Sequence, residues 1–305
     1  MYLGIDTSNY TTSAALLSMQ QGKNVSRLLD VAPGTLGLRQ SDALFQHVKR
    51  LPEIMQTLLS SFDGRQIRAI AASTRPRAVE GSYMPCFLAG ESTAKCMAQA
   101  LGVPFHGVSH QQGHIAAVLW SAGRMNLLNQ PFLAWHLSGG TTELLLIEPE
   151  GDLFSARKIG GTTDISAGQA IDRAGVMLNL PFPAGKSLDA LAADSGISDC
   201  FRVKLNGLDF SFSGLENKAQ EFYARSKNDA DTAAYVIGSV CDLIRRATLS
   251  ALKAYPEYPV VFSGGVSSNR RLRAVCNDFD AVFSEPQYAT DNAMGVAVLC
   301  SLLEG

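Results

Sequence analysis

"FLAWHLSGGTTELLLIE", residues 132–148, contains two apolar segments joined by a short polar one. Apolar segments of this kind around a Gly- and Thr-rich centre predict two strands and a tight turn. The turn, residues 138–142, has two adjacent glycines and three hydroxyl side chains, which is more than a hairpin needs. Consecutive glycines let a backbone approach a ligand closely, and the amides of a tight turn can bind an anion. The turn therefore predicts a phosphate-binding loop, with a plain hairpin turn as the alternative.

A similar pattern opens the chain. "LGIDTSNYTTSAALL" at residues 3–17 and "AWHLSGGTTELLLI" at residues 134–147 both read as strand, Ser/Thr-rich turn and strand. Self-similarity of this kind suggests that one unit has been duplicated. Because β-hairpins resemble one another in sequence, chance likeness is the alternative.

Strands and helices are expected to alternate after each hairpin, as in an α/β protein. In the first half we expect a strand pair over 1–18, a helix from a Ser41 cap to residue 62, a strand over 67–74, a helix over 87–101 ended by Gly102, a strand over 103–108 and a helix over 110–120. Residues 121–131 suggest a connector. After the 132–148 hairpin we expect a strand over 153–159, a helix from about 167, a loop over 181–189, helices over 215–226 and 232–254, a strand over 259–265, a helix over 269–276, a strand over 281–285 and a last helix over 291–303.

The composition limits the classes of function. The chain has 305 residues, of which 46% are hydrophobic, and a formal net charge of -2. A large core is therefore available, but no global basic field attracts nucleic acid, so a local patch or a partner would have to do so. Six cysteines are scattered without a CxxC pair and are expected to be buried free thiols. The sequence has neither a signal-peptide pattern nor a membrane-spanning run, which predicts a cytoplasmic protein without membrane contact.

Two further glycine-containing segments favour nucleotide binding. In "VVFSGGVSSNRRLR", a buried strand runs into Gly264 and Gly265, and a helix is expected to start near Asn269. Such an arrangement suits the phosphate or the purine face of a nucleotide. "KIGGTTDISAGQAIDRAG", residues 158–175, adds a third such loop, followed by Asp172, which could bind ribose hydroxyls. Neither the dinucleotide fingerprint nor a P-loop is present.

His110 and His114 in "HQQGH" are candidate metal ligands. Residues four apart on a helix share one face, so both rings can bind one divalent ion. A zinc-protease mechanism is disfavoured because Gln111 stands where such enzymes have a catalytic glutamate. Asp291 in "YATDNA" offers a distant third ligand. Two unrelated histidines are the alternative. Neutral histidines with one carboxylate suit Zn²⁺ or Fe²⁺.

These pieces together resemble the tRNA threonylcarbamoyladenosine transferases, also called the glycoprotease M22 or O-sialoglycoprotein endopeptidase family. The similarity extends over nearly the whole chain and rests on the order and spacing of "GIDTS", "HQQGH", "LSGGTTELLLI", "GGTTDISAGQAIDRA", "PFPAGKSLD", "DFSFSGLENK", "SGGVSSNRRLR" and "TDNAMGVA".

The resemblance implies an actin-like fold of the sugar-kinase/Hsp70/actin (ASKHA) type, with two duplicated α/β domains around a nucleotide cleft. The first domain would comprise residues 1–120 with the last helix, about 291–305, packed back on it, and the second would comprise residues 121–290. By position, His110, His114 and Asp291 would hold the metal. The residues expected to contact ATP or an acyl-adenylate are Leu137, Ser138, Gly139, Gly140, Thr141, Asp172, Gly185, Gly264, Gly265 and Asn269.

The chain also departs from the usual family motifs. At residues 137–141 the histidine of the usual SGGHT is missing, and the usual ETSCDET reads "DTSNYTT". The usual GPGL after the third strand is "RPRAVEGS", which is bulkier and more cationic, and PGGP is "PAGK". The metal and nucleotide positions are retained, whereas several cleft positions are not, as expected of a divergent bacterial paralogue.

The resemblance implies a transferase that moves a threonylcarbamoyl group from its adenylate to N6 of a tRNA adenosine. One alternative is a paralogue that carries a carbamoyl or other acyl group to a non-tRNA acceptor. Another is a non-catalytic, nucleotide-binding actin-like partner, and peptidase activity is the least favoured. The family implies an actin-like partner subunit, expected on the helix near 41–59, and a small ATPase. Arg270, Arg271 and Arg273, with Arg75 and Arg77, could contact RNA phosphate, a solvated helix face being the alternative.

Overall fold

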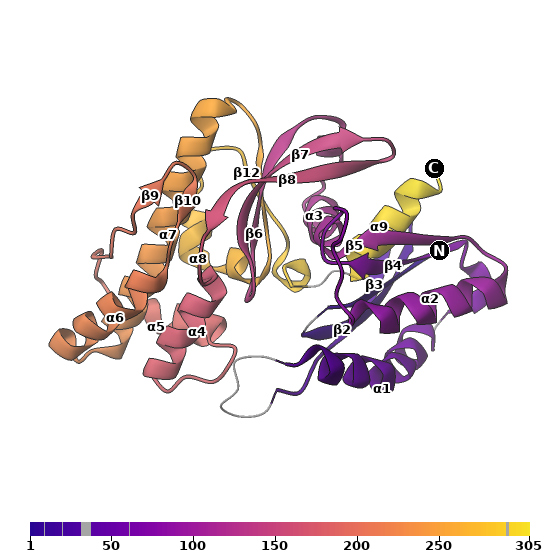
Figure 1. The fold of residues 1–305 in the computed structure, drawn as a ribbon, viewed down its shortest axis with the longest axis horizontal. Helices are drawn as coiled ribbons and strands as arrows, with labels where there is room; N and C mark the ends of the chain where they lie inside the picture. The colour runs from indigo at the N-terminus through magenta and orange to yellow at the C-terminus, as the bar shows by residue number, and fades with distance from the viewer. Residues whose placement is uncertain (9, 20, 32–37, 61, 291–292) are drawn as a thin grey trace. The chain divides into compact units, whose positions relative to one another are not determined.

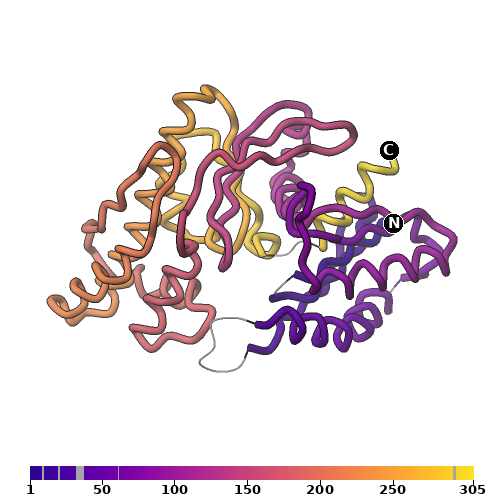
Figure 2. Tube along the Cα trace, viewed as in Figure 1, coloured from indigo at the N-terminus to yellow at the C-terminus, as the bar shows by residue number. Residues whose placement is uncertain are grey.

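The computed structural model describes the chain except for residues 9, 20, 32–37, 61 and 291–292. The chain folds into two compact units. Unit 1 consists of Met1–Asn129, Glu148–Ala156 and Asp291–Gly305, and unit 2 consists of Gln130–Ile147 and Arg157–Thr290. The tube trace in Figure 2 follows the chain from its indigo start to its yellow end.

Unit 1 contains a five-stranded sheet in the order β3-β2-β1-β4-β5. Its strands are β1 (Tyr2–Thr7), β2 (Thr11–Ser18), β3 (Gln21–Leu28), β4 (Ala69–Arg75) and β5 (Phe105–Ser109). The first three strands are antiparallel neighbours, whereas β1, β4 and β5 run parallel. The carboxyl ends of β1, β4 and β5 therefore lie at one edge of the sheet, where α/β proteins place their ligands.

Helices pack against the sheet of unit 1. Helices α1 (Gln40–Leu59) and α2 (Phe87–Leu101) share a core with β1, β2 and β4. Helices α3 (His110–Ser121) and α9 (Ala293–Leu303) pack against each other, and α9 lies on β1. A Cβ atom added to Gly4 of β1 would lie 2.3 Å from the carbonyl oxygen of Ala293, so the glycine allows this close packing. The yellow α9 among the early strands is visible in Figure 1.

Unit 2 contains a seven-stranded sheet in the order β12-β11-β6-β7-β8-β10-β9. Its strands are β6 (Phe132–Leu137), β7 (Thr142–Glu150), β8 (Leu153–Thr162), β9 (Leu205–Asn206), β10 (Asp209–Phe210), β11 (Val260–Ser263) and β12 (Ala281–Phe283). The central order β8-β7-β6-β11-β12 repeats the order β3-β2-β1-β4-β5 of unit 1. In both units the first two strands are antiparallel and the later ones parallel. The predicted architecture of two repeated α/β units is confirmed.

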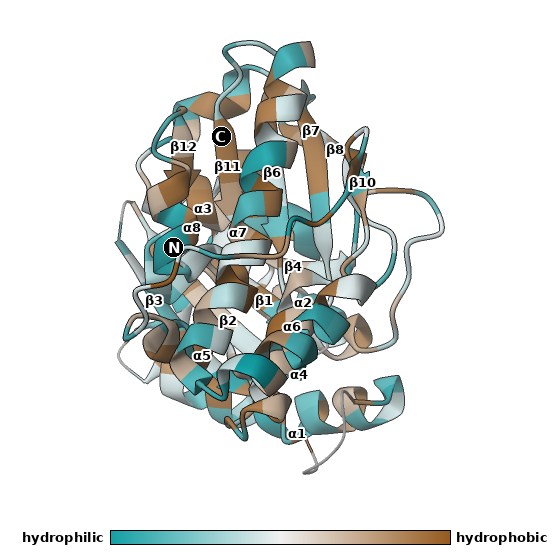
Figure 3. Ribbon diagram, turned by 90° about the vertical axis from the view of Figure 1, so that its left-hand side faces the viewer, coloured by the Kyte–Doolittle hydropathy of each residue, from teal (hydrophilic) through white to brown (hydrophobic). Residues whose placement is uncertain are grey.

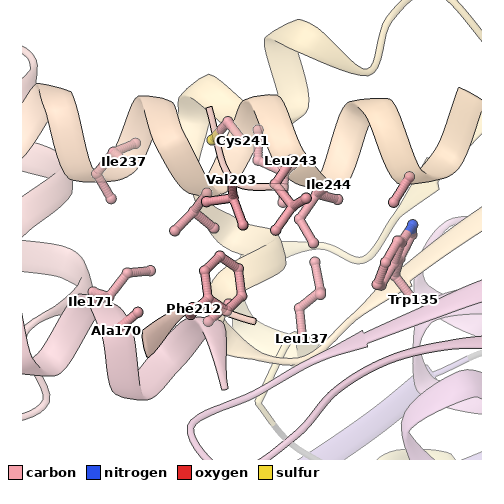
Figure 4. Packing of buried hydrophobic residues seen from close by; sticks show 14 of the residues in the cluster. Trp135, Leu137, Ala170, Ile171, Val203, Phe212, Ile237, Cys241, Leu243 and Ile244 are labelled. Atoms are coloured by element: carbon pink, nitrogen blue, oxygen red, sulfur yellow. The ribbon is translucent and has the colours of Figure 1, made fainter. Parts of the chain in front are cut away.

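The core of unit 2 lies between this sheet and its helices. These are α4 (Ala167–Met177), α5 (Gly185–Ala192), α6 (Ser213–Ser226), α7 (Asp229–Ala254) and α8 (Arg270–Val275). In Figure 4, Ile237 and Ile244 of α7 lie on the side of the helix that faces Ile171, Phe212 and Leu137. The indole Nε1 of Trp135 donates to the Thr248 hydroxyl at 2.8 Å, so its polar atom is satisfied inside the core. The apolar centre of β7 appears as a brown stretch in Figure 3.

Most predicted elements occur where expected, with a few differences. Helix α1 begins at Gln40 after Arg39, which makes no side-chain cap, so Ser41 is not the cap. The segment 181–189 is not all loop, because α5 begins at Gly185. Strand β3 and the short pair β9 and β10 were not expected. Within the described residues, no helix has the length and apolar character needed to cross a bilayer.

The cysteines are free, as expected from their spacing. Cys86, Cys241, Cys276 and Cys300 are buried, and burial is the main reason why the pKa of the Cys86 thiol is raised to about 12. Cys96 is exposed, so the expectation of burial is not met there. Buried thiols with raised pKa values are poor nucleophiles, which leaves them a packing role.

Candidate functional site

The turn between β6 and β7 is closed by its own hydrogen bonds. The amide of Ser138 donates to the carbonyl oxygen of Thr141 at 2.8 Å, and the amide of Thr141 donates to the Ser138 hydroxyl at 3.0 Å. Gly139 and Gly140 are exposed at the tip, and a Cβ atom added to either would meet nothing within 4 Å. In the described part of the chain, neither glycine amide donates to another residue. Two amides at an open tip can bind an anion.

Helix α4 holds this turn in place. The Ser166 hydroxyl, which caps α4, donates to the carbonyl oxygen of Gly139 at 2.7 Å. The amide of Ala167 donates to the Thr142 hydroxyl at 2.8 Å. A Cβ atom on Gly168 would lie 2.6 Å from the Cα of Gly139, so the helix touches the turn directly. Because Thr142 is only 1% exposed, its hydroxyl supports the helix and does not face a phosphate.

The second predicted glycine pair lies beside the end of β6. Gly264 follows β11, which runs parallel to β6, and has φ 88°. A Cβ atom there would lie 2.3 Å from the carbonyl oxygen of Leu137. Gly264 thus lets the two strand ends approach, while the exposed Gly265 starts a 3₁₀ turn, η3 (Gly265–Ser268). Since α4 also contacts η3, the turn, α4 and η3 surround one edge of the sheet.

The glycines of the third predicted loop lie in a strand, and the loop itself, residues 163–166, follows them. Gly160 and Gly161 lie inside β8. Gly161 has φ 143°, and a Cβ atom on it would lie 2.5 Å from the carbonyl oxygen of Thr142. A Cβ atom on Gly160 would lie 2.4 Å from the Cβ of Leu208. Packing between strands therefore explains both glycines.

Asp172 and Gly185 lie close together. The Oδ1 atom of Asp172 accepts a hydrogen bond from the amide of Ala184, the residue before Gly185, at 2.8 Å. Burial raises the pKa of the Asp172 carboxyl, and the bond from Ala184 opposes that effect. A Cβ atom on Gly185 would meet nothing within 4 Å, so α5 begins at an open surface. The Asp172 carboxylate and Gly185 therefore lie close together beside α4.

Asn269 is already bound within the protein. Its Oδ1 accepts from the amide of Leu272 at 2.9 Å and caps α8, and its Nδ2 donates to Asp189 at 2.7 Å. The side chain is 9% exposed. Asn269 therefore links α8 to α5 and so lies near Gly185, but both of its polar atoms serve the fold.

The arginines beside Asn269 also bind within unit 2. Arg270 donates to the Asp189 carboxylate at 3.1 Å, and Arg271 donates to the carbonyl oxygen of Ala234 at 3.1 Å. Arg273 donates to the carbonyl oxygens of Ser267 and Ser284 and lies over the ring of Phe283. These contacts favour a structural role for the cluster, and they weaken the hypothesis that it binds RNA phosphate.

The two predicted metal ligands of unit 1 face each other. His110 is the first residue of α3, and Ser109 caps the helix through a capping box with Gln112. The ring centroids of His110 and His114 lie 4.8 Å apart at an interplanar angle of 70°. His114 is 5% exposed, whereas the His110 side chain is 20% exposed. The helical spacing therefore brings both rings together at the carboxyl end of β5.

Asp6 orients His110 and was not among the residues predicted from the sequence. Its Oδ1 lies 3.0 Å from Nδ1 of His110, and the residue is only 1% exposed. A carboxylate on one ring nitrogen fixes the imidazole and leaves the other nitrogen for a metal. The available signal was the position of Asp6 at the carboxyl end of β1, directly before the Ser/Thr-rich turn.

The residues present fit two ligands of a divalent metal site. Paired imidazoles with a carboxylate behind one of them form a common donor set for Zn²⁺ or Fe²⁺. Where the chain is described, no group of three or more His, Cys, Asp or Glu side chains could hold a metal ion. The third predicted ligand, Asp291, lies outside the described residues.

The chain is similar to known proteins in family, in sequence and in structure. Residues 35–298 match the family model for tRNA N6-adenosine threonylcarbamoyltransferase. The protein of that name from Streptococcus suis is 34% identical over 244 residues, which cover 74% of this chain and 70% of the relative. The one from Carboxydothermus hydrogenoformans is 31% identical over 318 residues, covering 97% of this chain and 90% of the relative.

Solved structures with the same fold are more distant in sequence. Full-length HypF in its phosphate- and nucleotide-bound form has a TM-score of 0.65 at 14% identity, covering 100% of this chain and 46% of that chain. A ROK family glucokinase from Streptomyces griseus, in complex with glucose and AMPPNP, has a TM-score of 0.55 at 11% identity, covering 100% of this chain and 99% of that chain. These similarities establish the actin-like fold.

Proposed function

The chain belongs to the family of tRNA N6-adenosine threonylcarbamoyltransferases, and we propose that it transfers a threonylcarbamoyl group from threonylcarbamoyl-AMP to N6 of an adenosine in tRNA. The single observation that carries the proposal is the family match over residues 35–298. The retained turn 138–141 and the histidine pair support it. Acting on tRNA, the enzyme would work in the cytoplasm.

The adenylate would bind along the edge of the sheet in unit 2. The open amides of Gly139 and Gly140 suit its phosphate, and Gly265 lies at the neighbouring strand end. Asp172 uses one carboxylate oxygen for the Ala184 amide, which leaves the other for a ribose hydroxyl. Gly185 would let the nucleoside approach α5 without a steric clash.

His110 and His114, with Asp291 as the third ligand, would hold one divalent metal ion, Fe²⁺ or Zn²⁺. When bound, such an ion neutralises negative charge on the group being transferred. Asp6 holds the His110 ring through Nδ1, so the ligand is oriented before any metal arrives. The two rings pack edge to face, which further limits their motion.

The reaction itself would depend on positioning and electrostatics. The N6 amine attacks the carbamoyl carbon, the bond from that carbon to the phosphate oxygen breaks, AMP leaves, and the amine loses a proton. Backbone amides at the turn would stabilise the departing phosphate. Holding the anhydride rigidly beside the amine supplies most of the remaining rate enhancement in reactions of this kind.

One observation favours a second candidate, a transfer to a non-tRNA acceptor. The arginines of α8 are engaged in unit 2, and the net charge is -2, so this region offers little attraction for a polyanion. A small or weakly charged amine would then replace tRNA, with the same adenylate as donor.

Product analysis distinguishes the two candidates. The purified protein is incubated with threonylcarbamoyl-AMP and tRNA, with and without an actin-like partner subunit and small ATPase from the same genome, and digested nucleosides are identified by mass spectrometry. We expect threonylcarbamoyladenosine, and we expect none with Gly140→Val, because its side chain would occupy the phosphate approach. Transfer of the threonylcarbamoyl group to an added amine with release of AMP, while the tRNA stays unmodified under all conditions, would support the second candidate instead.

Metal content tests the histidine pair separately. The double variant His110→Ala/His114→Ala removes both imidazoles, so we expect it to lose stoichiometric metal after reconstitution with Fe²⁺ or Zn²⁺. His106→Ala is the matched control, because His106 binds Glu304 and not the pair. Elemental analysis gives the answer, and equal metal in the double variant and the wild type would refute the assignment.

A further inference from the structure

The turn after β1 in unit 1 corresponds to the turn after β6 in unit 2. Strand β1 ends at Thr7, which is paired with Thr12, and β6 ends at Leu137, which is paired with Thr142. The two turns thus have the same length and the same place in repeated sheets. Thr12 and Thr142 are both buried, at 0% and 1% exposure.

In each unit a helix holds this turn through the same two kinds of contact. In unit 2, the start of α4 binds the Thr142 hydroxyl through the Ala167 amide and the turn carbonyl of Gly139 through Ser166. In unit 1, one residue of α1 makes both contacts. Nδ1 of His47 lies 2.8 Å from the Thr12 hydroxyl, and its Nε2 lies 2.7 Å from the carbonyl oxygen of Ser8.

The burial of His47 suits it to make these two bonds. The residue is fully buried at 0% exposure, in the middle of α1. A carbonyl oxygen can only accept, so Nε2 carries the proton and donates to Ser8. Nδ1 then accepts from the Thr12 hydroxyl, which makes the ring a neutral bridge across the turn. Burial also lowers the pKa of His47, in agreement with a neutral ring.

We propose that His47 is a positioning residue for the His110/His114 pair and acts through Asp6. Ser8, which His47 holds, lies two residues after Asp6 on the same stretch of backbone. Asp6 in turn binds Nδ1 of His110. Fixing the end of β1 fixes the carboxylate, and the carboxylate fixes the ring. The inference rests on the proposed function only where it assigns a metal to the histidine pair.

Two variants separate positioning from general stability. His47→Leu removes both bonds while keeping an apolar side chain, and His47→Gln retains one donor for Ser8 and one acceptor for Thr12. His106→Leu is the control, because it removes an imidazole of unit 1 that binds Glu304. Hydrogen exchange of peptides within residues 2–18, measured by mass spectrometry, reports on the two hydrogen bonds that His47 makes to Thr12 and Ser8. Titration with Co²⁺, a spectroscopic probe for Zn²⁺ sites, reports on the histidine pair.

We expect His47→Leu to accelerate exchange around the turn and to weaken Co²⁺ binding by about 10–100-fold, the effect typical of losing a partner behind a metal ligand. His47→Gln should retain most of the slow exchange and most of the Co²⁺ affinity of the wild type. His106→Leu should change neither the exchange nor the affinity. Wild-type exchange in His47→Leu, or accelerated exchange with undiminished Co²⁺ binding, would overturn the inference. If the wild type binds no Co²⁺, the metal assignment fails and the inference fails with it, whereas a failure of tRNA modification alone leaves both standing.

Discussion

At the scale of single residues, glycine pairs that follow a strand and a serine in the same way have different physical roles. Gly139 and Gly140 have open space where a side chain would be, so the backbone does not require them. Gly264 has φ 88° and lies against the end of β6, so the fold does require it. A glycine without a structural reason, at the tip of an anchored turn, is the better candidate for ligand contact.

Valine substitutions should separate these roles. Gly140→Val should fold normally and lose most ATP binding, because the side chain points into the open approach to the turn. Gly264→Val should lower the free energy of unfolding by about 1–3 kcal/mol, from backbone strain and the clash with Leu137. Calorimetric titration with ATP and urea denaturation measure the two effects. ATP binding by Gly140→Val at wild-type strength would remove the turn from the nucleotide site.

At the scale of a single element, helix α6 is capped by a residue from another segment of the chain. Its own N-cap residue, Phe212, makes no side-chain cap. Asp164, in the loop after β8, instead accepts from the amides of Phe212 and Ser213, each at 2.9 Å. The hydroxyls of Ser211 and Thr162 also donate to this carboxylate. Asp164 thus joins the end of β8 to the start of α6.

This cap should make the free energy of unfolding depend on pH in the acid range. Burial raises the pKa of Asp164, but the four hydrogen bonds outweigh it and lower the pKa to about 2, from the ordinary aspartate value of 3.8. A lowered folded-state pKa means that the stabilisation is fully present above pH 3.8 and is lost as the pH falls toward 2. Asp164→Ala should cost about 1 kcal/mol at pH 7, and the difference from wild type should shrink below pH 3.8.

Urea denaturation at pH 7, 4 and 3 measures the effect. Asp152→Ala, an exposed carboxylate in the turn before β8, is the matched control and should change stability little. A constant difference between Asp164→Ala and wild type across this range would show that the charge of Asp164 is not what stabilises α6.

One surface of the whole molecule suits a protein partner. The buried face of α1 holds His47 and the core of unit 1, while its other face carries Phe45 and Val48 at 65% and 58% exposure. Exposed aromatic and aliphatic side chains on one helix face are typical of interfaces. Since the family resemblance implies an actin-like partner subunit, we propose that it binds this face of α1.

Charge substitution on α1 should weaken binding of the proposed partner subunit and leave the fold intact. We expect Phe45→Glu/Val48→Glu to keep the wild-type melting temperature and to weaken binding of the partner subunit by about 30-fold or more, as for an interface hot spot. Val176→Glu, at a residue of unit 2 with 63% exposure, is the control. Light scattering coupled to gel filtration, followed by calorimetric titration, measures the complex. Undiminished binding would place the partner elsewhere.

The sequence alone determined the features that depend on neighbouring residues. The 132–148 hairpin, the i,i+4 histidine pair and the end of α2 at Gly102, which has φ 67°, follow from local spacing and backbone preference. The repeat could also be recognised, because each copy starts with the same strand–turn–strand pattern. The family motifs then pointed to most of the residues of unit 2 that the proposed nucleotide site uses.

Tertiary structure decided what depends on residues far apart in the chain. Strand β3, a polar segment, becomes a strand because the exposed edge of β2 offers it backbone partners along its whole length. Gly160 and Gly161 proved to be packing glycines, and Asn269 and its arginines proved to be bound within unit 2. Asp6 and His110 are separated by 104 residues, and Thr12 and His47 by 35. No local pattern encodes such contacts, because burial and hydrogen bonding between distant segments are settled only when the sheet and its helices pack together.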